Sequence, residues 1–166
     1  KMIHDIDIVL SLVKSDVHSL DATGMSIITN SLDIAQARIK FKNGTVASLM
    51  SSRIAQSDVR KIKLFQKNLY STIDLLKGST EIYKVEENER SSSDILKSAE
   101  FQRNGQKSFI NYMKPNLKKH DALELELKNF LYSIIGKEKP VVDGKSGRDA
   151  LSLALKIQKK IKMNFT

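Results

Sequence analysis

The sequence predicts an α+β fold, with one open, mainly antiparallel sheet of about six strands and helices packed on one face. Three observations predict it. Short segments with alternating apolar and polar residues occupy the middle of the chain, from about Val17 to Met113. An Asn43-Gly44 pair, which favours the tight turn of a hairpin, joins two of them. Strands that precede a pair of closing helices are typical of α+β layers rather than of a doubly wound parallel sheet.

The central hairpin runs over 33–53. On its first arm, Ile39 and Phe41 share one parity, and on its second arm Ala47 and Leu49 share one parity. Side chains of alternate parity lie on opposite faces of a sheet, so one face is expected to be buried and the other polar. The polar parity of the first arm consists of Gln36, Arg38, Lys40 and Lys42.

The two-residue alternation of strands and the 3.6-residue period of helices predict the remaining strands and the first helix. A helix is predicted over Met2–Lys14, and a strand over Val17–Ile28 with Gly24 as a bend or bulge. The polar stretch 86–106 is predicted to be a mobile excursion from the sheet, with a short helical turn near Ile95–Phe101. The other predicted strands are Val59–Leu64, Leu69–Leu75, Thr80–Val85 and Ser108–Met113.

Two helices are predicted to close the chain. Asp121 is the expected N-cap of the first, and Gly136 is expected to end it. Ser146 is the expected N-cap of the second. The apolar stripe of that last helix consists of Ala150, Leu153, Ala154, Ile157 and Ile161.

Composition excludes several classes of protein. With 166 residues, 40% of them hydrophobic, the chain 1–166 is expected to form a single globular domain. The absence of cysteine excludes disulfides and thiolate chemistry, and it is compatible with the cytoplasmic location that we expect. No apolar run approaches the roughly 20 residues that span a bilayer, so no membrane partner is expected. The net charge of +9 is spread over strand arms and the last helix, and we do not expect a nucleic-acid partner.

No complete catalytic or cofactor motif is present in the sequence. There is no G-x-G-x-x-G turn and no phosphate-binding loop. His4, His18 and His120 lie far apart in sequence, so no metal site is predicted. Asp33 is expected to be a strand-edge or turn residue, and Arg53 to be solvated or in an interface ion pair.

Four segments, taken in order, carry a resemblance to a known family. They are HDID at the first helix, ATG in the next strand, D-x-A-x-A-x-I-x-F-x-N-G-x-x-A through the hairpin, and R-D-A-L-S-L-A-L-K-I in the last helix. This series resembles the C-terminal domain of the Gfo/Idh/MocA oxidoreductases, the family of glucose–fructose oxidoreductase and inositol dehydrogenase. The resemblance extends from Met2 to about Ile161.

The resemblance implies that two domains have separate roles. In the family, an N-terminal Rossmann domain binds NAD or NADP, and the sheet domain shapes the pocket for a sugar, cyclitol or related polyol. The sheet domain commonly forms the oligomer interface through its open face. No Rossmann domain is encoded in this sequence, so we expect a truncated fragment of a dehydrogenase or reductase that is inactive alone and has no cofactor-binding residues of its own.

His4 is the candidate catalytic residue that the resemblance implies. In the family, a histidine at this position often acts on the substrate hydroxyl together with a lysine of the N-terminal domain. An imidazole suits proton transfer near neutral pH. The alternative is an ordinary exposed or hydrogen-bonded histidine at a helix start. The family's catalytic lysine often lies in an E-K-P motif, but Glu138-Lys139-Pro140 lies between the closing helices and is interpreted as a coincidence.

The other parity of the second hairpin arm predicts self-association. Val46, Ser48, Met50 and Ser52 form a mixed face that suits a partner sheet better than water, so a homo-oligomer built sheet to sheet is expected. Two alternatives of other classes stay open. One is a non-catalytic dimerising or scaffolding module of the same fold. The other, less favoured, is a basic RNA-binding sheet in which Phe41, Tyr70 or Tyr112 stacks on bases.

Overall fold

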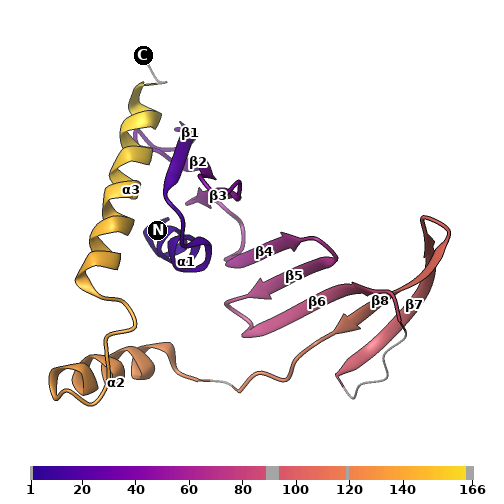
Figure 1. Ribbon diagram of the computed structural model, residues 1–166. Coiled ribbons are helices and arrows are strands. Elements are labelled where there is room, and N and C mark those ends of the chain that lie inside the picture. The colour runs from indigo at the N-terminus through magenta and orange to yellow at the C-terminus, as the bar shows by residue number, and fades with distance from the viewer. Residues whose placement is uncertain (1, 89–93, 119, 164–166) are drawn as a thin grey trace. The chain divides into compact units, whose positions relative to one another are not determined.

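The structure is a computed structural model that describes residues 2–88, 94–118 and 120–163 (Figure 1). The chain divides into two compact units, one formed by Lys1–Gln56 with Leu127–Thr166 and the other by Ser57–Glu126. Each unit has its own antiparallel sheet. The α+β class and the open antiparallel architecture are therefore confirmed. The strands are divided between a sheet of three and a sheet of five, because β3 and β4, which follow one another, are not paired.

The first unit contains a helix, a three-stranded meander and the last helix. The helix α1 (Ile3–Val13) leads into β1 (Val17–Met25), β2 (Ile34–Phe41) and β3 (Val46–Ser52), which pair in the order β1-β2-β3. The last helix, α3 (Gly144–Met163), runs beside this sheet and contacts β1 and α1 (Figure 1). The predicted hairpin is confirmed, and in its register Ile39 faces Ala47 and Ala37 faces Leu49.

The core of this unit lies between the sheet and the two helices. Ile39 and Phe41 are buried as predicted, and Ile6 of α1 is buried against them. The stripe of α3 contributes the other buried side chains, which are Ala150, Leu153, Ile157 and Ile161. Gly24 is not a bulge but a point of close packing. A Cβ atom there would lie 2.8 Å from Leu32 Cδ2 and 2.9 Å from Ile161 Cγ2.

The second unit is a five-stranded antiparallel sheet. Its strands are β4 (Lys61–Gln66), β5 (Leu69–Asp74), β6 (Ser79–Glu86), β7 (Ile95–Arg103) and β8 (Gln106–Met113), in the order β4-β5-β6-β8-β7. The boundary between the units falls within α2 (Ala122–Ile134).

The predicted excursion over 86–106 is wrong for most of its length. Ile95–Arg103 forms β7, an extended strand rather than a helical turn, and it pairs with β8 from Ile95–Met113 to Arg103–Gln106. The missed signal is Asn104-Gly105, where both residues have positive φ (52° and 78°) and close a tight hairpin. Ladder hydrogen bonds hold this strand at the sheet edge, so it needs little apolar character. Residues 89–93 of the predicted excursion lie outside the described residues.

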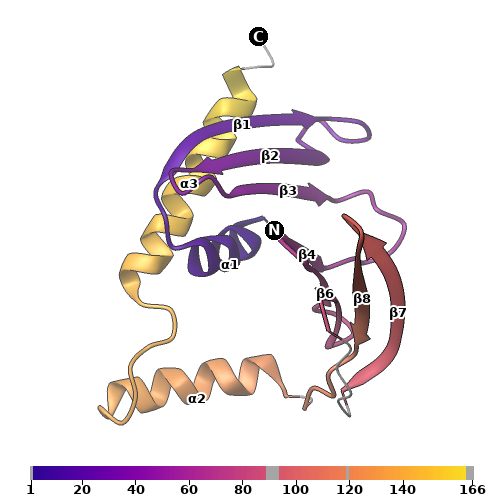
Figure 2. The same cartoon turned by 45° about the vertical axis from the view of Figure 1, so that its right-hand side comes forward.

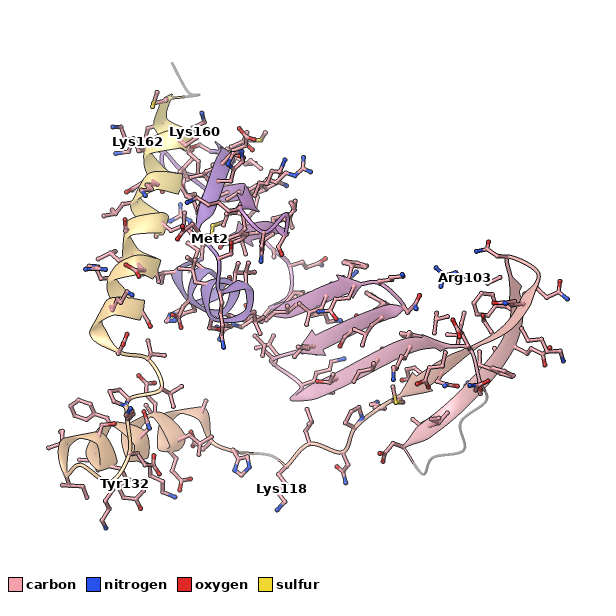
Figure 3. The ribbon with its side chains drawn as sticks, in the orientation of Figure 1. Met2, Arg103, Lys118, Tyr132, Lys160 and Lys162 are labelled. Carbon is pink, nitrogen blue, oxygen red and sulfur yellow. The ribbon has the colours of Figure 1, made fainter. Side chains whose placement is uncertain are left out.

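The helix ends confirm one predicted cap and correct another. Asp121 Oδ1 accepts hydrogen bonds from the N–H groups of Leu123 and Glu124, at 2.9 and 3.2 Å, as an N-cap does. The cap of α3 is Asp143 instead of Ser146, since Asp143 Oδ1 accepts the Ser146 N–H at 2.8 Å. That hydrogen bond lowers the pKa of Asp143. At the other end of α3, Lys160 and Lys162 lie in the last turn (Figure 3), where cations complement the helix dipole.

Within the described part of the chain, no helix is both long and apolar enough to cross a lipid bilayer.

Replacing Ile39 by alanine tests the core of the first unit. The Ile39 side chain is fully buried, so Ile39→Ala is expected to lower the free energy of unfolding by about 2–5 kcal/mol. Met50→Ala, at an exposed position on the neighbouring strand β3, is the control and is expected to change the free energy of unfolding by less than about 0.5 kcal/mol. Urea unfolding followed by circular dichroism measures both, and equal losses would contradict the placement of this core.

Candidate functional site

The predicted catalytic residue, His4, lies in the first turn of α1 and is exposed. Ile6, two residues later, is buried in the core. Residues two apart on a helix lie on nearly opposite sides, so His4 faces away from the core. Among the described residues, His4 has neither a hydrogen bond nor an ion pair. The imidazole is therefore presented at the surface of the unit, free to contact a further group.

The structure does not bring the three histidines together. His18 is exposed on β1 and His120 is exposed just before α2. The described residues contain no group of three or more side chains that could hold a metal ion. The connection between β1 and β2 lies toward the same end of the three-stranded sheet as the start of α1 (Figure 2).

That connection is organised by one carboxylate, Asp33. Its Oδ2 accepts hydrogen bonds from the backbone N–H groups of Ile27, Ile28 and Thr29, at 2.8, 2.7 and 2.9 Å. Its Oδ1 accepts the Thr29 hydroxyl at 2.8 Å and Arg53 Nη2 at 3.1 Å. One side chain thus fixes the loop that follows β1 to the end of β3.

Asp33 is buried, with only 2% of its surface exposed, and its charge is compensated locally. The three N–H groups of Ile27, Ile28 and Thr29 favour the ionised form and hold the pKa of this carboxyl far below its usual range. The sequence predicted a turn residue at Asp33 but missed its ion pair with Arg53, for which an interface or solvated role was expected. The run T-N-S-L-D before β2 is a polar turn signal, but nothing in it identifies Arg53 as the partner.

The open face of the three-stranded sheet carries unpaired charge. A shallow depression there is lined by Ser19, Asp21, Arg38, Lys40 and Val46. Asp21 lies opposite Arg38 in the ladder, yet neither these two nor Lys40 forms an ion pair within the part of the chain that the structure describes. Since α1 and α3 cover the other face, this depression and the helix that bears His4 lie on opposite sides of the sheet.

Asn111 of the second unit is fully buried and lies in a polar network. Its amide accepts a hydrogen bond from Ser98 Oγ at 2.8 Å and donates one to Glu86 Oε2 at 2.8 Å. Lys84 Nζ donates to the other Glu86 oxygen, also at 2.8 Å. The alternation that predicted the strands gave no sign of this network, since its members lie on three different strands.

The opposite face of that sheet carries a row of aromatic rings. Phe65, Tyr70, Tyr83 and Tyr112 lie opposite one another on four successive strands, with ring centroids 5.0, 5.8 and 5.0 Å apart. Burial and the nearby Glu81 raise the pKa of Tyr112. Phe65, Tyr70 and Tyr83 are stacked, with interplanar angles of 20° and 21°, whereas Tyr112 is tilted by 41° against Tyr83.

This arrangement removes two of the three side chains that the RNA-binding alternative named. Phe41, one of the three predicted stacking residues, is 1% exposed and belongs to the core. The faces of Tyr70 are taken by Phe65 and Tyr83 at stacking distance, so a base cannot stack on it.

The chain's own residues do not fit a nicotinamide dinucleotide. Such cofactors place their diphosphate at a helix N-terminus after a glycine-rich turn from a parallel strand. In the described residues all paired strands are antiparallel, and α2 and α3 follow no such turn. A dinucleotide would have to be held by another part of the protein.

Comparison with known proteins gives a consistent relationship. No family model matches the chain. UDP-N-acetylglucosamine 3-dehydrogenase from Acidithiobacillus ferrooxidans is 29% identical over 157 residues, which are 95% of this chain and 46% of the relative. The solved structure of that dehydrogenase, GnnA, superposes with a TM-score of 0.79 over 98% of this chain and 46% of its own.

More distant structures share the fold. An NAD-binding protein from Listeria innocua is 18% identical with a TM-score of 0.68, and covers 98% of this chain and 44% of its own. The WlbA dehydrogenase from Bordetella pertussis, solved with NADH and UDP-GlcNAcA, is 15% identical with a TM-score of 0.56, over 98% of this chain and 41% of its own. This chain therefore spans about half the length of the relatives it matches. The resemblance indicated by the sequence motifs is confirmed.

Neutralising the Asp33 carboxylate is expected to loosen the β1–β2 connection. Asp33→Asn should lower the urea midpoint of unfolding at pH 7 by roughly threefold more than Asp16→Asn, whose carboxylate pairs with Lys42 at the exposed surface. Because the folded pKa of Asp33 is lowered from 3.8, its contribution is complete above pH 4 to 5 and is lost as the pH falls further. Unfolding curves of both variants at several pH values measure this. An Asp33→Asn effect that grows with acidity would contradict the role of the carboxylate.

Proposed function

We propose that this chain, which has the fold of the C-terminal half of the Gfo/Idh/MocA-type oxidoreductases, is the substrate-binding half of an NAD(P)-dependent dehydrogenase. The proposed substrate belongs to the sugar and polyol class, and more narrowly is a nucleotide-linked amino sugar. NAD or NADP would be bound by a separate nucleotide-binding domain of the same protein. The absence of cysteine is compatible with a cytoplasmic location for the reaction.

One observation carries the choice of substrate. The similarity to UDP-N-acetylglucosamine 3-dehydrogenase extends along nearly the whole chain rather than over one motif. The part of that enzyme matched here is about half of it, so both the activity and the substrate of the whole protein are inferred from the relationship.

The chemical task that falls to this chain is the transfer of a proton. Oxidation of a secondary alcohol to a ketone releases a hydride and the hydroxyl proton. An exposed imidazole without an internal partner, such as that of His4, is suited to accept that proton when the hydroxyl group lies within hydrogen-bonding distance. The hydride acceptor is the cofactor's contribution, and no residue of this chain is assigned to it.

Substituting His4 tests this assignment. In the protein at the full length that its gene encodes, with NAD+ and UDP-N-acetylglucosamine, His4→Gln is expected to lower kcat by about 10²–10⁴-fold. The formation of NADH, followed by absorbance, measures it. His18→Gln changes another exposed histidine of the same unit and is expected to leave kcat unchanged. Equal activity of His4→Gln and the wild type would remove His4 from the mechanism.

We also propose that the protein is a homo-oligomer built sheet to sheet. Val46 and Met50 of the face predicted from the sequence are exposed, and the aromatic row of the five-stranded sheet is a second exposed apolar surface, which we assign as the interface. Phe65 is 74% exposed and Tyr83 38% exposed. Tyr70 and Tyr112 are half-buried, so the row is the apolar centre of the proposed interface, and neighbouring side chains of the same face supply the rest of the about 800 Å² per partner that a specific interface needs.

A charge in the aromatic row should therefore prevent assembly. Phe65→Glu is expected to convert the oligomer to a monomer, measured by size-exclusion chromatography with light scattering. Gln102→Glu adds the same charge at an exposed position on the other face of the sheet and should leave the oligomer intact. A wild-type protein that is monomeric at high concentration would contradict the proposal.

A non-catalytic scaffolding module of the same fold is the second candidate. It is favoured by the aromatic row, which offers an assembly surface that needs no catalytic group. Binding of NADH and turnover of UDP-N-acetylglucosamine distinguish the two candidates. A full-length protein that dimerises but does neither would be a scaffold.

A further inference from the structure

We propose that the connection between β1 and β2, residues 26–32, is a preformed docking loop that packs against an uncharged, apolar surface of the nucleotide-binding domain. This inference rests on the proposed function, because it requires such a domain in the same protein. It assigns the loop the role of coupling the two domains, in addition to the chemistry assigned to His4.

The loop presents apolar side chains to the outside. Ile27 is 53% exposed and Ile28 is 74% exposed, and Met25 at the end of β1 is 57% exposed. None of the residues in 26–32 (S-I-I-T-N-S-L) carries a charge, although charged residues make up 28% of the chain. A neutral, apolar surface of this kind suits an apolar protein surface rather than a phosphate or another anionic ligand.

The loop is also held in one conformation from both of its ends. Asp33 binds three consecutive N–H groups of the loop through a single oxygen. The Asp33 N–H donates to the Met25 carbonyl at 2.9 Å, and the Arg53 N–H donates to the Asp33 carbonyl at 2.8 Å. Arg53 Nη2 reaches Thr29 Oγ1 at 2.9 Å. A loop ordered before contact loses little conformational entropy on binding, so its apolar side chains contribute more to affinity.

The position of the loop favours the nucleotide-binding domain as its partner. The loop and the start of α1 lie toward the same end of the three-stranded sheet (Figure 2). Leu32 at the base of the loop and Met2 and Ile3 at the start of α1 pack against the same core. The matched relatives are about twice as long as this chain, and a domain joined ahead of α1 would be attached at this end.

The test compares two variants of the full-length protein. The double variant Ile27→Gln/Ile28→Gln removes the apolar surface of the loop while keeping every backbone hydrogen bond to Asp33. Leu12→Gln changes a 55% exposed apolar residue of α1 and is the matched control. Hydrogen exchange at amides of β2 is measured with and without saturating NADH, which binds the other domain.

In the wild type and in Leu12→Gln, NADH is expected to slow exchange in β2 at least about tenfold, since binding energy is transmitted through docked domains. In the double variant this slowing should vanish even at saturating NADH, and by linkage NADH should bind correspondingly more weakly. If NADH still slows hydrogen exchange in β2 of the double variant, the proposal is overturned. Two other results would also overturn it. If the double variant turns an oligomer into a monomer, the partner of the loop is a second copy of the chain. If the double variant only raises KM for the sugar nucleotide, the loop is part of the substrate pocket. A wild type that binds no NADH would instead refute the proposed function itself.

Discussion

The packing of α1 and α3 on one face of β2 is the constraint on which the candidate site depends. Ile39 and Phe41 supply the sheet side of this contact, and Ile6 supplies the helix side. Because Ile6 must face the core, the helical period turns His4 outward. The same contact leaves the other face of the sheet open, with Asp21, Arg38 and Lys40 on it. A single apolar layer thus determines which groups are buried as structure and which are presented to other molecules.

The second sheet is stabilised differently. Its buried side chains in the described residues are polar, namely Ser71, Asp74, Ser108 and Asn111, and none belongs to the apolar core. Ladder hydrogen bonds and cross-strand pairs, including the aromatic row, hold its strands together. A sheet with so little buried apolar surface gains stability from a further layer. The proposed self-association through the aromatic row would supply that layer.

The sequence predicted the parts of the fold that depend on periodicity. The burial of Ile39 and Phe41, the stripe of α3 and most strand positions follow from spacings of two or of three and four residues. It failed where local chemistry outweighs hydrophobic pattern. The strand β7 forms because of the Asn104-Gly105 turn, and α3 begins at an aspartate cap three residues before the predicted serine. Likewise, the Asp33–Arg53 pair joins residues 20 apart, and no period relates them. His4 was found only through the family resemblance, because an exposed histidine has no pattern of its own.

The central claim is that His4 meets the substrate of a two-domain dehydrogenase. Its most direct test is the proton NMR signal of the three imidazoles in the full-length protein, titrated with UDP-N-acetylglucosamine in the presence of the nicotinamide cofactor. The account predicts that the ring signals of His4 shift, while those of His18 and His120 stay where they are. Shifts at His18 or His120 without any at His4 would contradict it.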